Sequence, residues 1–305
     1  MVPPDPTRRA LLAAGVGAAF ALPAAREAAA GRSPGPPPSG GMKFALKVGM
    51  IGAGANLAEK LALAKRVGYD GVELDSPCEH PLDEVLAAKA SAGIEIPGVV
   101  DSAHWRDTLG DPDAAVRARG VAALETALRD ARAWGATSVL LVPGVVNERM
   151  AYDDVMRRSR AEVARCLPLA EELGVDILFE NVWNGFLLTP VEAARYVDEF
   201  ESPRVGWHFD VGNVVNFGWP EQWIRILGAR IKKLDVKEFS REKRDREGLW
   251  KGFAVEIGEG DCGWERVREA LRDVGYSGWA AAEVGGGDEA RLADVLRRMR
   301  AVLTP

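Results

Sequence analysis

A histidine and an aspartate stand two positions apart in the stretch GWHFDVGN, which covers residues 206–213 and continues an apolar run. Side chains alternate between the two faces of a β-strand, so His208 and Asp210 are expected to point the same way. A buried carboxylate without a partner is strongly unfavourable. We therefore expect a positive charge, from a metal ion or a basic side chain, close to Asp210.

Acidic residues follow other apolar runs in the same way. Glu180 ends ILFE, Asp235 follows IKKL, and Glu283 follows WAAA. If these runs are neighbouring strands, their carboxylates converge, and repulsion would keep one or more of them protonated. A divalent cation removes this conflict, and ligands that are all oxygen favour a hard ion. The sequence predicts one cation, Mn²⁺ or Mg²⁺, held by Glu180, Asp210, Asp235 and Glu283. For each single acid, an ion pair with a lysine or arginine is the alternative.

The elements that must position these residues alternate between short apolar strands and amphipathic helices. Strands are predicted at residues 43–51, 69–75, 94–101, 136–144, 175–181, 204–212, 230–239 and 278–284. Helices are predicted at residues 56–68, 82–93, 113–135, 152–174, 220–227, 264–274 and 288–303, and one begins at Thr189–Pro190. Glycines before several strands mark the helix ends.

This alternation predicts an α/β fold with a parallel sheet covered by helices. Eight units in roughly 260 residues match the (β/α)8 TIM barrel, which we assign to residues 42–305. Sites in such barrels lie at the C-terminal ends of the strands. An open doubly wound sheet is the alternative, but no strand–helix turn carries a GxGxxG phosphate fingerprint.

The first 41 residues differ in composition from the rest. Residues 1–30 hold the pair Arg8–Arg9 directly before an apolar run, and small residues follow. This pattern is typical of a twin-arginine signal peptide; a general secretory signal or a disordered tail is the alternative. Residues 31–41 are rich in proline and glycine and are expected to form a flexible linker. We therefore expect export to the periplasm or another extracytoplasmic site, with no stable membrane span after signal removal.

Composition argues against two classes of site. The formal net charge of −6 gives no basic surface for a nucleic acid. The three cysteines, Cys78, Cys166 and Cys262, have neither CxxC spacing nor a nearby histidine cluster. Neither a disulfide framework nor a structural zinc site is expected.

From Lys43 to its end the chain resembles the xylose isomerase-like barrel family. That family includes sugar phosphate isomerases and epimerases, ketose 3-epimerases, hydroxypyruvate isomerases and apurinic endonucleases. Its pattern places Glu at the end of strand five, Asp at the end of strand six, usually His in an HxKD-like motif on strand seven, and Glu at the end of strand eight. The matching positions here are Glu180, Asp210, the stretch Asp235-Val-Lys-Glu and Glu283. The stretch GEGDCGWERVREAL from Gly258 also resembles the segment before the family's seventh helix.

The chain departs from that pattern at two positions. Asp235 stands where many relatives have histidine, which adds negative charge and favours Mg²⁺ or Mn²⁺ over Zn²⁺. Lys237 lies two residues further on the same face and is a candidate counter-charge to Asp235. Asn213 stands where relatives often have histidine; it can bond to a sugar hydroxyl but cannot carry a proton near neutral pH.

The resemblance implies an isomerase or epimerase that moves a proton next to a sugar carbonyl through an enediolate. Glu180 and Glu283 are the predicted catalytic pair, one removing the proton and the other returning it. Trp105 could stack on a sugar ring or close the barrel mouth, and the apolar setting of His208 also fits a core histidine. The predicted substrate-binding residues are Glu73, His104, Trp105, His208, Asn213, Lys237 and Arg241.

Several alternatives stay open at this point. The charged stretch that includes Arg241 would either clamp a phosphate or form a solvated lid, and its interleaved acids favour the lid. In an exported protein, an unphosphorylated sugar or glycoside is the expected substrate. The alternatives are a keto-sugar lyase or dehydratase, and a non-catalytic sugar-binding barrel with a degenerate metal site. A nuclease is disfavoured by the presence of only three histidines. Dimers and tetramers are common in the resembled family, so the resemblance allows a homo-oligomer.

Overall fold

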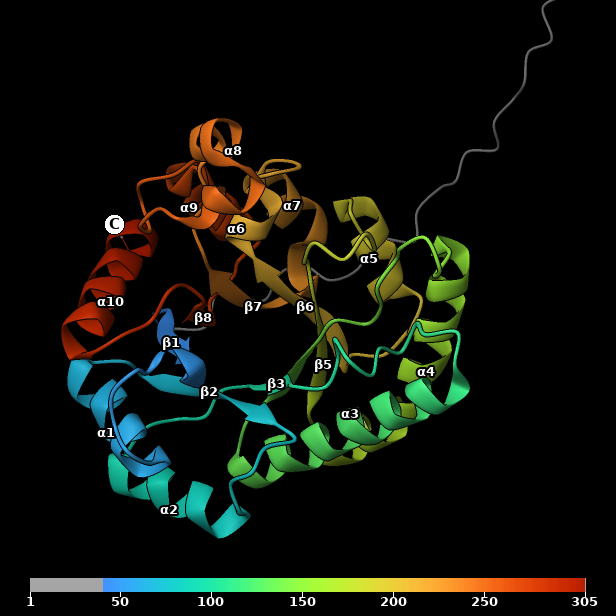
Figure 1. Ribbon diagram of the computed structural model, residues 1–305, viewed down its shortest axis with the longest axis horizontal. Helices are drawn as coiled ribbons and strands as arrows, with labels where there is room; N and C mark the ends of the chain where they lie inside the picture. The colour runs from blue at the N-terminus through green and yellow to red at the C-terminus, as the bar shows by residue number, and fades with distance from the viewer. Residues whose placement is uncertain (1–40, 305) are drawn as a thin grey trace, which may run out of the picture. The chain divides into compact units, whose positions relative to one another are not determined.

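The computed structural model describes residues 41–304, and in this part of the chain eight parallel strands close into one barrel. Figure 1 shows the helices outside the ring of strands. The predicted (β/α)8 barrel is thereby confirmed, whereas the predicted signal at 1–30 and nearly all of the linker at 31–41 lie outside the described residues. The strands are β1 (Lys43–Lys47), β2 (Gly71–Ser76), β3 (Val99–Asp101), β4 (Ser138–Leu141), β5 (Asp176–Glu180), β6 (Val205–Asp210), β7 (Ile231–Val236) and β8 (Trp279–Ala282).

The predicted helices form, and local sequence signals set their ends. Thr189 accepts a hydrogen bond from the Glu192 N–H, and Pro190 occupies the first turn. Gly135 and Gly174 end two helices in the left-handed conformation that glycine adopts without steric penalty. The helices are α1 (Leu57–Val67), α2 (Leu82–Ala92), α3 (Ala114–Trp134), α4 (Tyr152–Leu173), α5 (Pro190–Asp198), α6 (Val211–Val214), α7 (Pro220–Leu227), α8 (Arg241–Glu247), α9 (Trp264–Asp273) and α10 (Glu289–Leu303).

None of the helices in residues 41–304 combines the length and the apolar character that a membrane crossing requires.

The strand expected at 94–101 forms only at Val99–Asp101, and two further segments differ from the prediction. The strand expected at 43–51 ends at Lys47, because the chain then turns to bond with the loop after β8. The Gly52 N–H donates to the Gly287 carbonyl at 2.9 Å, and the Gly287 N–H donates to the Met50 carbonyl at 3.0 Å. We call this pair of hydrogen bonds the seam. The charged stretch after β7 forms α8 and a 3-10 turn at Leu249–Phe253 instead of an open loop.

The register of β6 against β7 determines which side chains meet inside the barrel. Trp207 and Phe179 lie on the outer face and pack edge to face with ring centroids 6.3 Å apart. The pairing shifts between Trp207 and His208, so that Asp210 lies directly opposite Asp235. Both carboxylates are fully buried. Two like charges on neighbouring strands require positive charge close by.

Candidate metal and substrate site

Four carboxylates meet at the C-terminal ends of the last four strands. Glu180 and Asp210 end β5 and β6, Asp235 lies one residue before the end of β7, and Glu283 follows β8. One oxygen from each lies within 4.8 Å of the others. All are buried except Glu283, whose side chain is 37% exposed. The structure thus brings together the four residues that the sequence proposed as ligands, and we call them the acid cluster.

Lys237 places its ammonium group against the acid cluster. Its Nζ lies 3.0 Å from Asp210 Oδ2 and 3.2 Å from Glu283 Oε2. Burial lowers the pKa of Lys237, but these carboxylates outweigh it and raise that pKa above its usual value. The sequence-based pairing of Lys237 with Asp235 is wrong. Lys237 lies one pleat further along, level with Glu283, whose N–H donates to the Val236 carbonyl at 3.2 Å.

The acids of the cluster repel one another despite this lysine. Burial, followed by the charge of Glu283, raises the pKa of Glu180 well above its usual range. Burial also raises the pKa of Glu283 to about 7, although Lys237 opposes the shift. The pKa of Asp210 is raised by burial and by Asp235, again against the effect of Lys237. One ammonium group therefore does not neutralise the cluster, and a further positive charge would be favourable there.

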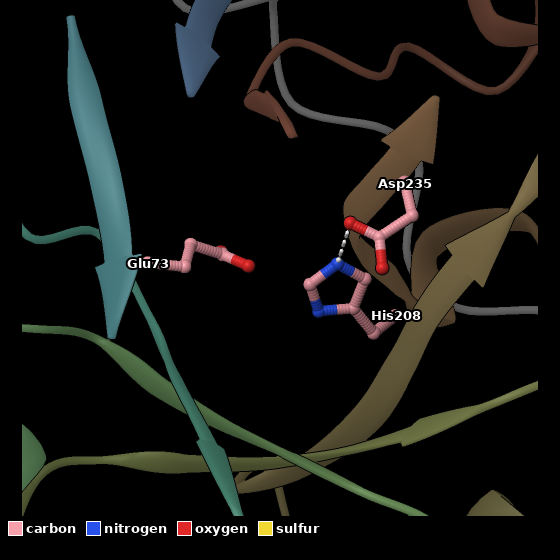
Figure 2. A group of neighbouring side chains, drawn as sticks. All are labelled: Glu73, His208 and Asp235. Carbon is pink, nitrogen blue, oxygen red and sulfur yellow. Dashed lines mark ion pairs between the residues drawn. The ribbon is translucent and has the colours of Figure 1, made fainter. Parts of the chain in front are cut away.

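A second charged layer lies beside the acid cluster in the barrel interior. Figure 2 shows Glu73 pointing from β2 toward His208 of β6 and Asp235 of β7. The Lys47 Nζ bridges the layer, 2.6 Å from Glu73 Oε2 and 2.9 Å from Asp235 Oδ1. On the other side of Glu73, Lys233 lies 3.2 Å from Oε1 and also donates to the Pro97 carbonyl. We call Lys47, Glu73, His208, Lys233 and Asp235 the inner layer.

Asp235 is shared between the acid cluster and the inner layer. Its Oδ1 lies 3.0 Å from His208 Nε2 and 2.9 Å from Lys47 Nζ. Burial raises the pKa of Asp235, but His208 and Lys47 outweigh it and hold that pKa below its usual value. Its Oδ2 has no hydrogen-bond partner among the described residues. The negative charge added by aspartate at this position is therefore offset by Lys47, which contacts the same oxygen as His208, and not by Lys237.

A cavity of about 870 Å³ opens at the barrel mouth above these groups. His104, Trp105, Asn213 and Lys237, all predicted to bind substrate, line it. Burial lowers the pKa of His104 to about 4, so this ring is neutral near pH 7. The other lining residues include Lys47, Asp75, Asp101, Glu180, Trp183, Trp250, Phe253 and Glu283.

Three predicted substrate contacts lie elsewhere. Glu73 and His208 are buried in the inner layer and do not line the cavity, because their strand positions are one pleat below the mouth. Arg241 also lies outside the cavity lining. Its guanidinium donates to the carbonyls of Val215 at 3.1 Å and Gly218 at 2.8 Å. Arg241 thus fastens α8 to the segment after β6 instead of facing a substrate.

The sequence analysis missed Lys47 and Asp101. Each ends a short apolar run, at β1 and β3, as the predicted acids do. The available signal was therefore the same: a charged residue at the C-terminal end of a barrel strand.

Asp101 provides a test of the electrostatics of the cavity wall. Burial raises its pKa to about 7, although the Ala103 N–H bonds to its carboxylate at 2.9 Å. In the unfolded chain an aspartate ionises near pH 3.9, so between about pH 4 and pH 7 the folded state binds the additional proton. Stability therefore falls as the pH rises through this window.

We expect Asp101→Asn to remove part of this loss. Urea unfolding in EDTA measures the free energy of unfolding of the variant and of the parent. The variant-minus-parent difference should rise by at least about 1 kcal/mol from pH 5 to pH 8. A difference that is the same at both pH values would contradict the assignment.

Comparisons with known proteins agree with this architecture. The family described as xylose isomerase-like TIM barrel matches residues 61–302. L-ribulose-5-phosphate 3-epimerase UlaE of Escherichia coli O1:K1 is 28% identical over 237 residues, which cover 74% of this chain and 81% of that protein. A structure of D-psicose 3-epimerase superposes with a TM-score of 0.70 at 19% identity, covering 87% of this chain and 100% of the other. A structure of 3-keto-D-glucoside 4-epimerase from E. coli gives 0.71 at 17%, with the same coverage.

Proposed function

Because the chain belongs to the xylose isomerase-like TIM barrel family, we propose that it is a sugar isomerase or epimerase that depends on one divalent cation. The observation that carries this proposal is the acid cluster at the base of the cavity, where four carboxylates approach one another, with Lys237 against Asp210 and Glu283 and Lys47 against Asp235. The UlaE relative is by name a 3-epimerase of a ketose phosphate, which supports the reaction class. The twin-arginine pattern at residues 1–30 leads us to propose an extracytoplasmic enzyme as well.

The donor chemistry of the acid cluster fits a hard divalent cation. Glu180, Asp210, Asp235 and Glu283 offer only oxygen, which suits Mn²⁺ or Mg²⁺. Asp235 Oδ2 is a buried oxygen without a hydrogen-bond partner in residues 41–304, while Oδ1 is fixed by Lys47 and His208. When bound, the cation would supply positive charge to adjacent substrate oxygens and stabilise the negative charge of an enediolate.

Proton transfer falls to Glu180 and Glu283. Both line the cavity at the mouth of the barrel: Glu180 ends β5, and Glu283 follows β8. One removes a proton next to the carbonyl, and the other returns it to the opposite face or to the neighbouring carbon. Without the cation, burial raises the pKa of both carboxylates, which shows that each can take up a proton in this environment. Asn213 Nδ2 donates to Glu180 Oε1 at 3.3 Å and orients that carboxylate.

Removal of the divalent ion tests the proposal. We expect dialysis of the purified protein against EDTA to abolish solvent deuterium uptake into ketoses, and Mn²⁺ or Mg²⁺ to restore it. NMR measures the exchange, and calorimetry is expected to give about one ion per chain.

Exchange that survives full removal of divalent ions would refute the metal dependence. A protein that binds sugars, but binds no divalent ion and catalyses no deuterium uptake into them, would instead be the non-catalytic barrel considered above.

A further inference from the structure

We propose that the substrate is an uncharged ketose with a second ring attached, as in a glycoside, and that this ring binds between Trp105 and an aromatic wall formed by Trp183, Trp250 and Phe253. This inference rests on the proposed function and adds the substrate class to it. Two observations carry the inference. Aromatic side chains surround the cavity, and each lysine among the described residues that line the cavity is already paired with carboxylates.

The aromatic wall is built from loops that follow two strands. Trp183 follows β5, and Trp250 and Phe253 follow β7. The ring centroid of Trp183 lies 4.9 Å from that of Trp250 and 4.9 Å from that of Phe253. The Trp183 indole donates to the Asn213 carbonyl at 2.8 Å, which fixes the wall beside the acid cluster.

The wall presents apolar surface that the protein itself does not cover. Trp250 is 69% exposed although it lines the cavity. Trp105 is 54% exposed and follows β3, which lies opposite β7 in the eight-stranded ring. Exposed aromatic rings on two sides of a cavity that also holds charged groups suit the C–H faces of a sugar ring, which stack on them while the hydroxyls reach polar groups.

The size of the cavity also favours a ligand longer than one ring. Its volume of about 870 Å³ lies in the upper part of the range of about 300–1,000 Å³ that holds drug-sized ligands. The acid cluster fixes one end of the ligand, where the proton moves. Phe253 lies beside the acid cluster, with its ring centroid 5.6 Å from Lys237 Nζ, whereas Trp250 is the exposed member of the wall and would contact a substituent on the reacting sugar.

The charges of the cavity disfavour a phosphate. Among the described residues that line it, the basic ones are Lys47 and Lys237, and each contacts two carboxylates. Asp75 and Asp101 add further acids to the wall. A phosphate dianion would have to break these ion pairs or lie next to unscreened carboxylates, whereas phosphate sites normally offer arginine or lysine free for binding.

The loop after β8, one of the two where TIM barrels often hold phosphate, uses its own donors. Phosphate sites in this fold commonly form after strands seven and eight. Here the Gly287 N–H belongs to the seam, and Asp288 caps α10 by accepting from the Arg291 N–H at 3.0 Å. The Arg291 guanidinium donates to the Gly285 carbonyl at 3.0 Å and to Glu256 at 2.7 Å. The anion position is thus taken by an acid of the chain.

Three matched sugars test the proposal: D-fructose, D-fructose 6-phosphate and isomaltulose, in which the same oxygen carries a hydrogen, a phosphate or a glucosyl group. With the Mn²⁺-loaded protein, calorimetry should show isomaltulose binding at least about fivefold more tightly than fructose, and the phosphate ester more weakly than fructose. Trp250→Ala should bring the isomaltulose-to-fructose ratio close to one. Trp219→Ala is the control, because Trp219 is a half-exposed tryptophan outside the cavity lining; it should preserve the ratio.

Tighter binding of the phosphate ester, no measurable isomaltulose binding, or an unchanged ratio in Trp250→Ala would each overturn the inference. Deuterium uptake, measured on the same sugars, separates it from the proposed function. Uptake that favours the phosphate ester leaves the proposed function standing and refutes the inference. Preferential isomaltulose binding that is lost in Trp250→Ala, without deuterium uptake into any sugar, supports the inference and refutes the proposed chemistry.

Discussion

Replacing Glu283 with glutamine is expected to abolish solvent deuterium uptake while the divalent cation still binds. The amide keeps an oxygen donor toward the acid cluster but cannot accept or return a proton near pH 7. General acid–base catalysis typically contributes about 10²–10⁴-fold, so we expect the exchange rate to fall by at least about 100-fold. NMR in deuterium oxide measures the exchange, and calorimetry with Mn²⁺ measures the ion.

Glu289→Gln is the matched control for this variant. Glu289 begins α10, is exposed, and pairs with Arg66 at 3.0 Å on the outer surface. The same chemical change there should leave both exchange and ion binding unaltered. Full exchange in Glu283→Gln would place the proton transfer on another residue, and loss of the ion would mean that Glu283 acts chiefly as a ligand.

Replacing Lys47 with methionine is expected to lower the free energy of unfolding by about 3–5 kcal/mol, the range for breaking a buried ion pair. Lys47 is the link between Glu73 and Asp235, and the variant leaves both buried acids without it. Burial raises the pKa of Glu73, but Lys47 and Lys233 outweigh it and lower that pKa to about 2. A glutamate in an unfolded chain ionises near pH 4.3. The stabilisation from this acid is thus present above about pH 4.3 and is lost as the pH falls toward about 2.

Lys43→Met provides the comparison within the same strand. Lys43 pairs with Glu95 at 2.5 Å, but the two side chains are 49% and 56% exposed. Exposed pairs contribute about 0–1 kcal/mol, so this variant should lose far less stability than Lys47→Met. Urea unfolding at pH 7 measures both. Equal losses would show that the inner layer is not a set of mutually dependent buried charges.

The fold and the acid cluster could be predicted because both follow from regular patterns. Barrel strands end at one rim, so acids after apolar runs, such as Glu180 and Glu283, had to converge. The partners of Lys237 could not be predicted in the same way. They are Asp210 and Glu283, and they depend on how β7 pairs with β6 and with β8, which no pattern within a single strand reports.

The inner layer and the aromatic wall were harder to foresee for a related reason. Lys47 and Glu73 lie on neighbouring strands, and their contact is visible only once the register of β1 against β2 is known. Trp183 and Trp250 come from loops after β5 and β7, where the path of the chain is set by packing rather than by periodicity. Single charged or aromatic residues in such positions do not stand out from ordinary surface residues.

The pairing of β8 with β1 makes closure of the barrel depend on the last strand to be synthesised. During translation, Glu180, Asp210 and Asp235 emerge before Glu283, and Lys237 is already present when three carboxylates can first gather. The ring can close only when β8 reaches β1, which also delivers the fourth carboxylate. A truncated product that ends before β8 would keep an open sheet edge. We expect such a product to be cleaved by proteases and to bind no substrate.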